Sequence, residues 1–440
     1  MNGQMALGMA DRDLNARRWY VLLVFTLAYA FAYLDRQILT LLVEPIRLDL
    51  ALNDTQIGLL QGLAFSLFFA LAGVPLGWLV DNRNRVGVAA VCVGTWGLAT
   101  AATGLATSYV QMVAARAGTA VAEAGCSPAA LSTFADIFPA RLVPRATAIY
   151  LTGPYIGGGL ALIGGSLALQ HFIANGGAEL PLLGRLAPWR AVFVVVGVPG
   201  LLLAALMRLT LREPPRTGPG LEADRTVSLG RTLRFIFMDS PYLRFYFAAY
   251  AFILTIVFVV LAWYPTLAIR EGMGSAASIG RPLGLIFLVC GCLGTLASQL
   301  AVRRLEDADV LARVLGVIAV FIAIQVPVMV VLTLSRSAAA AFALYAAEIL
   351  CLSVLTALMP VALQVGVPSR MRGRVIGLFL LTVNLVGGSV GPAAVGALSD
   401  ASKATEHALS KAMSIVAVVA SVLAFLLIQF ARKRQRGAAP

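Results

Sequence analysis

The chain has 440 residues, of which 60% are hydrophobic and only 12% are charged. A soluble globular chain carries about 25% charged residues, so this composition excludes an ordinary water-soluble domain and indicates a protein that lies in lipid. The net charge of +13 raises the question of nucleic acid. The basic residues are dispersed among short polar segments, however, which is typical of membrane topology, and no nucleic-acid partner is expected.

Apolar runs of about 20 residues recur along nearly the whole chain, and each is long enough to cross the hydrocarbon core of a bilayer. Backbone groups find no water there, so each run is expected to be a helix. The predicted spans are residues 19–42, 56–80, 86–107, 109–136, 143–170, 189–211, 241–268, 280–302, 310–334, 338–366, 372–398 and 409–431. The sequence therefore predicts an all-α polytopic membrane protein with twelve transmembrane helices in two six-helix bundles.

The segments between spans alternate between rich and poor in basic residues. Those near Arg17, Arg83, Arg141 and Arg370 are rich, and so is the C-terminal tail. The positive-inside rule then places both termini in the cytoplasm. Abundant Ala, Gly and Arg with few Lys favour a bacterial source, so we expect an integral protein of the plasma (bacterial inner) membrane.

One long polar stretch, residues 212–240, separates the sixth span from the seventh. It contains Pro214-Pro215 and Gly218-Pro219-Gly220, which break regular structure. We interpret it as a cytoplasmic linker between an N-terminal bundle, residues 1–211, and a C-terminal bundle, residues 241–440.

The two halves carry a faint internal repeat. Arg145 before the fifth span and Arg374 before the eleventh follow a proline at the same spacing, and both are expected to act in gating. Tyr155 and Asn384 occupy equivalent positions in the repeat and are predicted to line a central cavity and bind substrate, with polar packing as the alternative. Such repeats are typical of transporters that bind their solute near mid-membrane between the halves.

Four charged side chains lie within the first and fourth predicted spans, well away from the span ends, namely Asp35 and Arg36 in the first and Arg116 and Glu123 in the fourth. A charge at such depth costs at least ~2.5–3.5 kcal/mol, so these residues are expected to face a cavity. With a rise of ~1.5 Å per residue, Asp35 and Arg116 share a level and are able to form an ion pair. Glu123 lies two turns further along the face of Arg116.

This constellation predicts a proton switch. An arginine beside a carboxylate keeps it ionised, and a solute anion that captures the arginine leaves the carboxylate free to take a proton. Asp35 and Glu123 are therefore the predicted proton-coupling groups, and Arg36 and Arg116 the predicted substrate-binding groups. The alternative is a pair that never breaks and only sets helix packing.

Glu348 stands alone within the tenth span. An isolated acid at that depth is predicted to line the C-terminal half of the cavity and to meet a cationic group of the substrate. The alternative is a carboxyl hydrogen-bonded to neighbouring helices.

The loop between the second and third spans reads Gly77-Trp78-Leu79-Val80-Asp81-Asn82-Arg83-Asn84-Arg85. It resembles the G-x-L-x-D-x-x-x-R/K gating motif of the major facilitator superfamily. The resemblance implies that Gly77, Asp81 and Arg85 act in gating, with Asp81 facing a helix N-terminus of the other half. Asp136, at the end of the fourth span, is interpreted as a cytoplasmic cap or gate residue.

Within the superfamily, the chain is most similar to the Spinster-like lipid transporters. The similarity is carried by Tyr33-Leu34-Asp35-Arg36, by the spacing from Arg116 to Glu123-Ala124, and by Ala135-Asp136-Ile137-Phe138. It implies a monomer, surrounded by membrane lipids, that moves an amphipathic substrate such as a lysolipid or sphingoid phosphate by alternating access coupled to protons.

Two other interpretations stay open. One is a proton-driven exporter of drugs or metabolites, or an organic-anion symporter, on the same fold. The other is a membrane-embedded enzyme or a non-transporting receptor. The sequence disfavours an enzyme and predicts no cofactor or metal, because it shows no His/Cys/Asp metal cluster, nucleophile elbow or nucleotide-binding loop.

Overall fold

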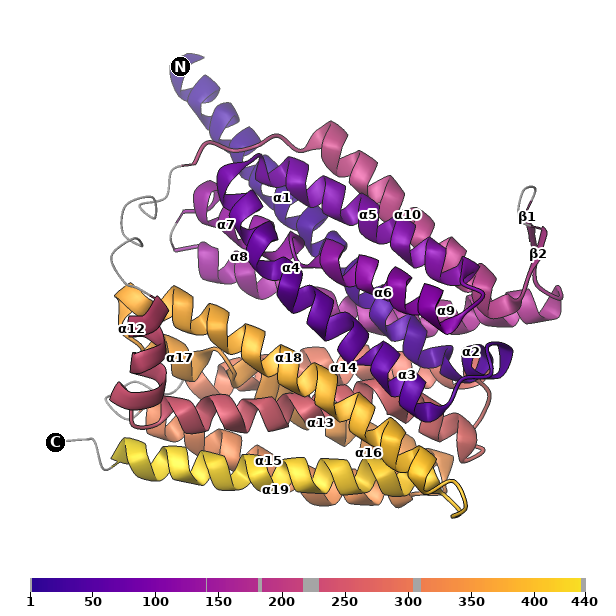
Figure 1. Ribbon diagram of the computed structural model, residues 1–440. Helices are drawn as coiled ribbons and strands as arrows, with labels where there is room; N and C mark the ends of the chain where they lie inside the picture. The colour runs from indigo at the N-terminus through magenta and orange to yellow at the C-terminus, as the bar shows by residue number, and fades with distance from the viewer. Residues whose placement is uncertain (1, 140, 181–183, 217–228, 304–309, 437–440) are drawn as a thin grey trace. The chain divides into compact units, whose positions relative to one another are not determined.

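The computed structural model describes residues 2–139, 141–180, 184–216, 229–303 and 310–436, and nearly all of them are helical. They form two compact units (Figure 1). Unit 1 comprises Met1–Arg36, Phe68–Ala161 and Phe172–Gly218, and unit 2 comprises Gln37–Leu67, Leu162–His171 and Pro219–Pro440. Residues 217–228 of the predicted linker lie outside the described residues.

The first half of the chain holds α1 (Asn2–Leu41), α2 (Val43–Asp49), α3 (Asp54–Gln61), α4 (Leu63–Asn82), α5 (Arg85–Leu105), α6 (Tyr109–Glu123), α7 (Cys126–Ile137), α8 (Val143–Tyr150), α9 (Gly153–Ala174) and α10 (Pro188–Thr210). A small antiparallel hairpin, β1 (Ala178–Leu180) and β2 (Gly184–Leu186), pairs Ala178 with Leu186.

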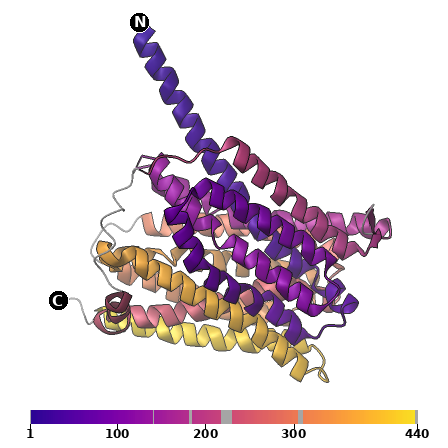
Figure 2. The same ribbon diagram turned by 45° about the horizontal axis from the view of Figure 1, so that its top comes forward.

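The second half holds α12 (Leu229–Arg234), the π-helix η1 (Phe235–Asp239), α13 (Leu243–Arg270), α14 (Ala276–Arg303), α15 (Val310–Leu334), α16 (Ala338–Leu358), α17 (Val361–Gly366), α18 (Ser369–Ala401) and α19 (Ala408–Arg436). Helix α19 lies beside α13 and α15 in unit 2, and α10 lies beside α5 in unit 1 (Figures 1 and 2).

The predicted all-α membrane fold is confirmed. Among the described residues, eleven helical segments are long and apolar enough to cross a bilayer. The predicted fourth span does not qualify as one helix, because it breaks at Ala124-Gly125 into α6, of 15 residues, and α7, of 12 residues. The short helices α2, α12 and η1 and the hairpin were not predicted, because they lie outside the apolar runs.

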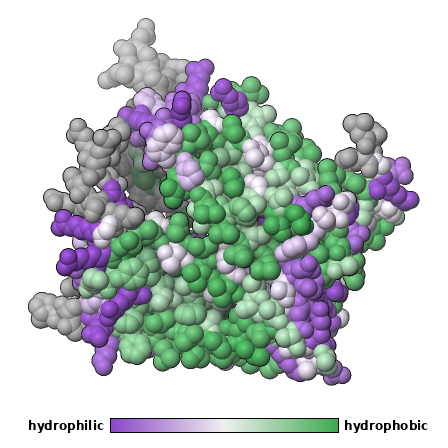
Figure 3. Space-filling model, viewed as in Figure 1, coloured by the Kyte–Doolittle hydropathy of each residue, from purple (hydrophilic) through white to green (hydrophobic). Residues whose placement is uncertain are grey.

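The surface of these helices is apolar over their middle parts. Leu202 is 66% exposed, Leu71 is 63% exposed and Val419 is 53% exposed. Figure 3 shows hydrophobic residues along the middle of α19 and hydrophilic residues towards its ends. So much exposed apolar surface would make a protein aggregate in water, whereas lipid tails solvate it. The chain is therefore an integral membrane protein.

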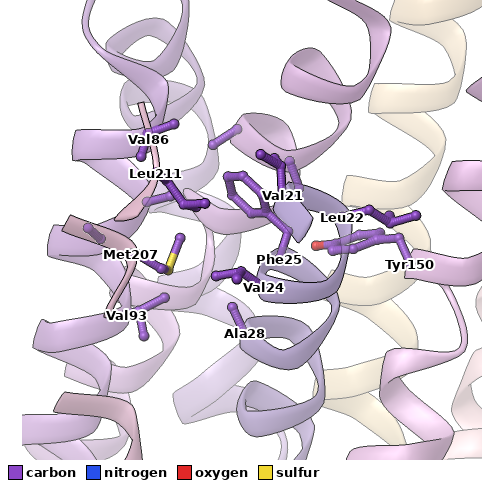
Figure 4. Packing of buried hydrophobic residues seen from close by; sticks show 14 of the residues in the cluster. Val21, Leu22, Val24, Phe25, Ala28, Val86, Val93, Tyr150, Met207 and Leu211 are labelled. Carbon is purple, nitrogen blue, oxygen red and sulfur yellow. The ribbon is translucent and has the colours of Figure 1, made fainter. Parts of the chain in front are cut away.

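The core of unit 1 forms around the first half of α1. Val21, Phe25 and Ala28 point from α1 towards Val93 of α5 and Met207 of α10 (Figure 4). These side chains are at most 7% exposed, so the cluster fixes α1 against two other helices. It thereby sets the position of the charged residues that follow on α1.

In unit 2, α3 packs with backbone contact against α18. A Cβ atom added at Gly58 would collide with the backbone of Pro392. Any side chain larger than hydrogen at position 58 would push the two helices apart, so glycine is required for the observed approach.

Gly58→Leu is expected to lower the stability of the protein in detergent, because overpacking a close contact costs about 1–3 kcal/mol. Gly377→Leu in α18 is the matched control, since a Cβ there would meet no atom within 4 Å. The control is expected to leave the protein unchanged or slightly more stable, because leucine favours helix over glycine. Thermal unfolding measures both, and equal shifts would contradict the packing argument.

Candidate functional site

The first buried ion pair joins α1 to α6. Arg116 Nη1 donates a hydrogen bond to Asp35 Oδ2 over 2.6 Å. The two side chains are 7% and 1% exposed, so the pair is almost completely removed from solvent. This is the pair expected from the helix rise, and its two charges compensate each other in a setting where either alone is very costly.

A second ion pair lies beside it, between Arg36 and Glu123. The Arg36 guanidinium donates from Nε over 3.0 Å and from Nη2 over 2.5 Å, both to Glu123 Oε2. The side chains are 18% and 5% exposed. Glu123 Oε1, also buried, has no hydrogen-bond partner among the residues that the structure describes. Half of this carboxylate is therefore left to accept a hydrogen bond or a proton.

The sequence did not predict the partner of Glu123. Arg36 follows Asp35 directly, so it lies only ~1.5 Å further along α1, on a face turned by about 100°. The spacing of the charges along α1 and α6 therefore does not identify this pair. Helix α6 ends at Glu123, which lies at the break before α7.

Aromatic rings surround the second pair. The Arg36 guanidinium carbon lies 4.9 Å from the centroid of the Tyr33 ring and 5.6 Å from that of Phe69. Tyr29 stacks on Tyr150 with ring centroids 4.6 Å apart. A cation over an aromatic face gains roughly 0.5–2 kcal/mol, so the Tyr33 and Phe69 rings help to hold Arg36 in place.

The Gly-Pro segment at the start of α9 packs closely against α1. Gly157 packs on the backbone of Ala30 in α1, closer than any side chain at that position would allow. Tyr155 is half-buried, two residues before this contact. In unit 2, Asn384 is half-buried and donates its amide to the backbone oxygen of Leu380 over 2.8 Å.

Arg85 of the gating motif is the centre of a polar cluster in unit 1. Its side chain, 1% exposed, forms ion pairs with Asp136 of α7 and with Glu213, the latter over 2.7 Å. Glu213 Oε2 also accepts from the Val86 amide at the start of α5 over 3.0 Å. Arg85 therefore connects α5 and α7 to the segment after α10.

Glu213 was not singled out from the sequence, because it lies in a polar linker where an acid is unremarkable. Asp81 is exposed at the end of α4, and its backbone oxygen accepts a hydrogen bond from Arg216. Gly77 is half-buried in α4, and a side chain there would meet no atom within 4 Å. The linker thus contacts the gating motif through both Glu213 and Arg216.

The two arginines of the internal repeat differ in exposure. Arg145 is exposed in α8, with its guanidinium carbon 5.8 Å from the Trp19 ring centroid. Arg374 is half-buried in α18. Arg145 belongs to unit 1 and Arg374 to unit 2.

Unit 2 contains an ion cluster that the sequence did not predict. Arg270, the last residue of α13, binds Asp54 through two hydrogen bonds of 2.7 Å and Glu44 through one of 2.5 Å. Asp54 also accepts from Ser399 of α18 over 2.7 Å. We call these residues, together with Asp400, the Arg270 cluster.

Asp400 of α18 caps the first turn of α3. Its carboxylate accepts from the Asp54 amide over 3.2 Å and from the Thr55 amide over 2.7 Å. The Thr55 hydroxyl adds a third bond of 2.6 Å. The free amides of a helix N-terminus favour an anion, so Asp400 fastens α3 to α18.

Glu348 is fully buried in α16 and accepts a hydrogen bond from the Gln325 amide of α15 over 2.9 Å. This corresponds to the alternative considered for it, a carboxyl bonded to a neighbouring helix.

Comparison with known proteins gives the same architecture. The family model of the Major Facilitator Superfamily matches residues 25–392. An "MFS-type efflux pump" of Mycolicibacterium smegmatis is 28% identical over 393 residues, which is 89% of this chain and 86% of the relative. The "Probable galactarate/D-glucarate transporter GudP" of Bacillus subtilis is 24% identical over 321 residues, 65% of this chain and 66% of the relative.

Among solved structures, the chain is similar to a bacterial homolog of the human lysosomal transporter Spinster, in an inward-facing and unoccupied conformation. The TM-score is 0.78 at 25% identity, over 96% of this chain and 97% of the other. The resemblance expected from the Asp-Arg and Arg…Glu motifs is confirmed. The matched model covers more than half of the chain, and the relatives carry transporter names. The protein is thus a transporter rather than an enzyme, and it belongs to the Major Facilitator Superfamily.

Proposed function

We propose that the protein is a proton-coupled secondary transporter of an amphipathic organic anion, of the lysolipid or sphingoid-phosphate type. The observation that carries the proposal is the presence of two buried arginine–carboxylate pairs, Asp35–Arg116 and Arg36–Glu123, side by side on α1 and α6. Two arginines supply binding charge for an anion, and two carboxylates supply places for protons.

Coupling follows from competition for the arginines. While Arg36 holds Glu123, the carboxylate stays ionised, because a charge-assisted pair favours the charged form. A solute phosphate or carboxylate that binds Arg36 removes this partner, and Glu123 then takes a proton rather than remain a buried lone charge. Asp35 and Arg116 repeat the same exchange one level away. Charge in the site stays balanced as solute and proton move together.

The surroundings of Arg36 support an amphipathic solute. Tyr33 and Phe69 place apolar ring surface within 6 Å of the guanidinium. An anionic head group bound to Arg36 therefore has aromatic faces beside it for an alkyl chain.

A sugar acid is the second candidate, because a relative is named as a galactarate/D-glucarate transporter. Arginines bind its carboxylates equally well, but its hydroxyl groups need polar partners in place of rings. Efflux of a drug or metabolite remains compatible with the name of the other relative. The same flux assay separates these solutes.

Alternating access needs a closure at each side of the membrane. We propose that Arg85 and its partners Asp136 and Glu213 form the closure at the cytoplasmic side. Further residues proposed to act there are Gly77, Asp81, Arg145 and Arg374. The Arg270 cluster is then the closure at the external side. This orientation places both termini in the cytoplasm, and the two bundles are proposed to comprise residues 1–211 and 241–440. Tyr155 and Asn384 are proposed as further cavity residues. The basic residues of the loops support this orientation.

Flux into proteoliposomes under an imposed pH gradient tests the proposal. We expect the wild type to accumulate a lysolipid phosphate or sphingoid phosphate when the gradient is present. Asp35→Asn and Glu123→Gln are expected to lose most of this pH-driven accumulation, because an amide cannot carry the proton. Glu179→Gln, an exposed acid of the hairpin, serves as control and should behave like the wild type.

Accumulation of galactarate instead of the lipids would favour the second candidate. Flux of every solute that is unaffected by the pH gradient, in wild type and variants alike, would overturn proton coupling.

A further inference from the structure

A buried polar chain crosses three helices of unit 2. Gln325 Nε2 of α15 donates to Glu348 Oε1 of α16 over 2.9 Å. Ser421 Oγ of α19 lies 3.0 Å from Gln325 Oε1 and 2.6 Å from the backbone oxygen of Ala417. Glu348, Gln325 and Ser421 are all 0% exposed, so water does not reach the chain from outside.

No cation compensates a charge on Glu348 in the described part of these helices. Helix α16 contains no Arg or Lys, and Arg313 of α15 lies 12 residues from Gln325. At ~1.5 Å per residue that is about 18 Å along the axis. Lys411 and Arg432 of α19 are similarly about 15 Å from the level of Ser421. Helix α13 has Arg244 and Arg270 at its two ends, and α14 has Arg281 and Arg303 towards its ends.

The other titratable groups on the packed helices are neutral at physiological pH. They are Tyr345 and Cys351 of α16, Tyr246, Tyr250 and Tyr264 of α13, and Cys290 and Cys292 of α14. Tyr264 stacks on Tyr345 with ring centroids 4.4 Å apart and donates its hydroxyl to the Ala341 backbone oxygen over 3.1 Å. An ionised Glu348 would therefore have one neutral amide as its only hydrogen-bonding partner among the described residues. A lone buried carboxylate takes a proton instead of bearing that penalty.

One arrangement of the hydrogens along the chain fits a protonated Glu348. The Ser421 hydroxyl has a single hydrogen, and the 2.6 Å contact with Ala417 is the shorter of its two. Exchanging the oxygen and nitrogen of the Gln325 amide leaves every heavy atom in place. The amide then donates to Ser421 Oγ, and Gln325 Oε1 faces Glu348, which needs a hydrogen of its own to complete the chain.

We propose that Glu348 is a proton-binding site. In this conformation its carboxyl carries a proton and donates it, in a hydrogen bond, to Gln325, which donates to Ser421, which donates to the Ala417 carbonyl. Glu348 Oε2, which has no hydrogen-bond partner in the described structure, is then the carbonyl oxygen of a neutral acid. Burying an unpaired carbonyl oxygen is far less costly than burying an unpaired charge.

The proton can leave only when α15, α16 and α19 move enough to admit water or a base. The Asp35 and Glu123 pairs lie in unit 1, and Glu348 lies in unit 2. A role for this proton in coupling transport to a pH gradient rests on the proposed transport function. The binding of the proton to Glu348 does not rest on it.

Infrared difference spectroscopy of the purified protein at neutral pH, without substrate, tests the site. The C=O stretching band of a protonated carboxyl group is absent from ionised carboxylates. We expect Glu348→Gln to lower the integrated intensity of this band, relative to the wild type, by the contribution of one carboxyl group. Glu271→Gln is the matched control, because Glu271 forms an ion pair with Arg336 over 2.9 Å and has no part in the buried chain, so the band should stay.

Gln325→Leu separates the hydrogen-bonded acid from an isolated one. The band should remain but move to higher frequency, because its hydrogen bond to the amide is lost. Glu348→Gln is nearly isosteric and keeps a polar partner for Gln325, and thermal unfolding verifies that it folds. A folded Glu348→Gln protein with an unchanged carboxyl band would overturn the proposal, whatever the protein transports.

Discussion

Arg116→Ala is expected to abolish transport of every anionic solute in proteoliposomes while the protein still folds. The substitution leaves Asp35 buried at 1% exposure without the guanidinium that compensates its charge. Removing one member of a buried pair costs about 3–5 kcal/mol. We therefore expect a clear drop in the unfolding temperature together with the loss of flux.

The double variant Asp35→Asn, Arg116→Gln distinguishes the two effects. It removes both charges, so most of the lost stability should return. Together with the single variants Asp35→Asn and Arg116→Gln, it forms a double-mutant cycle that measures the interaction energy between the two side chains. Flux should stay absent, because Arg116 no longer supplies its anion-binding charge and Asp35 no longer supplies its proton acceptor, and the Arg36–Glu123 pair alone does not complete the site. Recovery of wild-type flux in the double variant would show that the pair has a purely structural role.

Arg85→Ala is expected to have the second-largest effect, on stability as well as on flux. It leaves Asp136 and Glu213 facing each other without the buried guanidinium that binds both. The loss should again be about 3–5 kcal/mol, because the side chain is 1% exposed. Thermal unfolding and initial flux rates measure the two consequences.

Arg83→Ala is the matched control for this prediction. Arg83 is exposed in the same motif, and surface charges of this kind contribute about 0–1 kcal/mol. Asp136→Asn combined with Glu213→Gln in the Arg85→Ala background should restore stability in part. If Arg83→Ala and Arg85→Ala had equal effects, net positive charge rather than the buried cluster would be responsible.

The sequence predicted the helices well because lipid imposes a simple rule on them. A span must be apolar over about 20 residues, and α10, α15 and α19 begin and end within a few residues of the predicted bounds, apart from the longer C-terminal end of α19. The break between α6 and α7 was missed because Ala124-Gly125 is apolar, so hydropathy continues across it.

The site was predictable where helix geometry alone determines a contact. The rise per residue predicts that Asp35 and Arg116 lie at the same depth along their helices, and their ion pair is present in the structure. The partner of Glu123 needed the rotation of α1 relative to α6, which only packing determines. The Arg270 cluster joins residues up to 346 positions apart near the ends of helices, where periodicity carries no information.

The cap that Asp400 places on α3 has a consequence for how salt acts on the protein. Its partners lie close to solvent, and Lys403, 63% exposed, binds the same carboxylate over 2.8 Å. Dissolved ions screen such contacts over about 8 Å at physiological ionic strength, whereas sealed pairs are screened much less. Raising the salt concentration therefore weakens the hold between α3 and α18 while Asp35 and Arg116 keep theirs. The protein thus has one electrostatic contact that responds to the medium and another that does not.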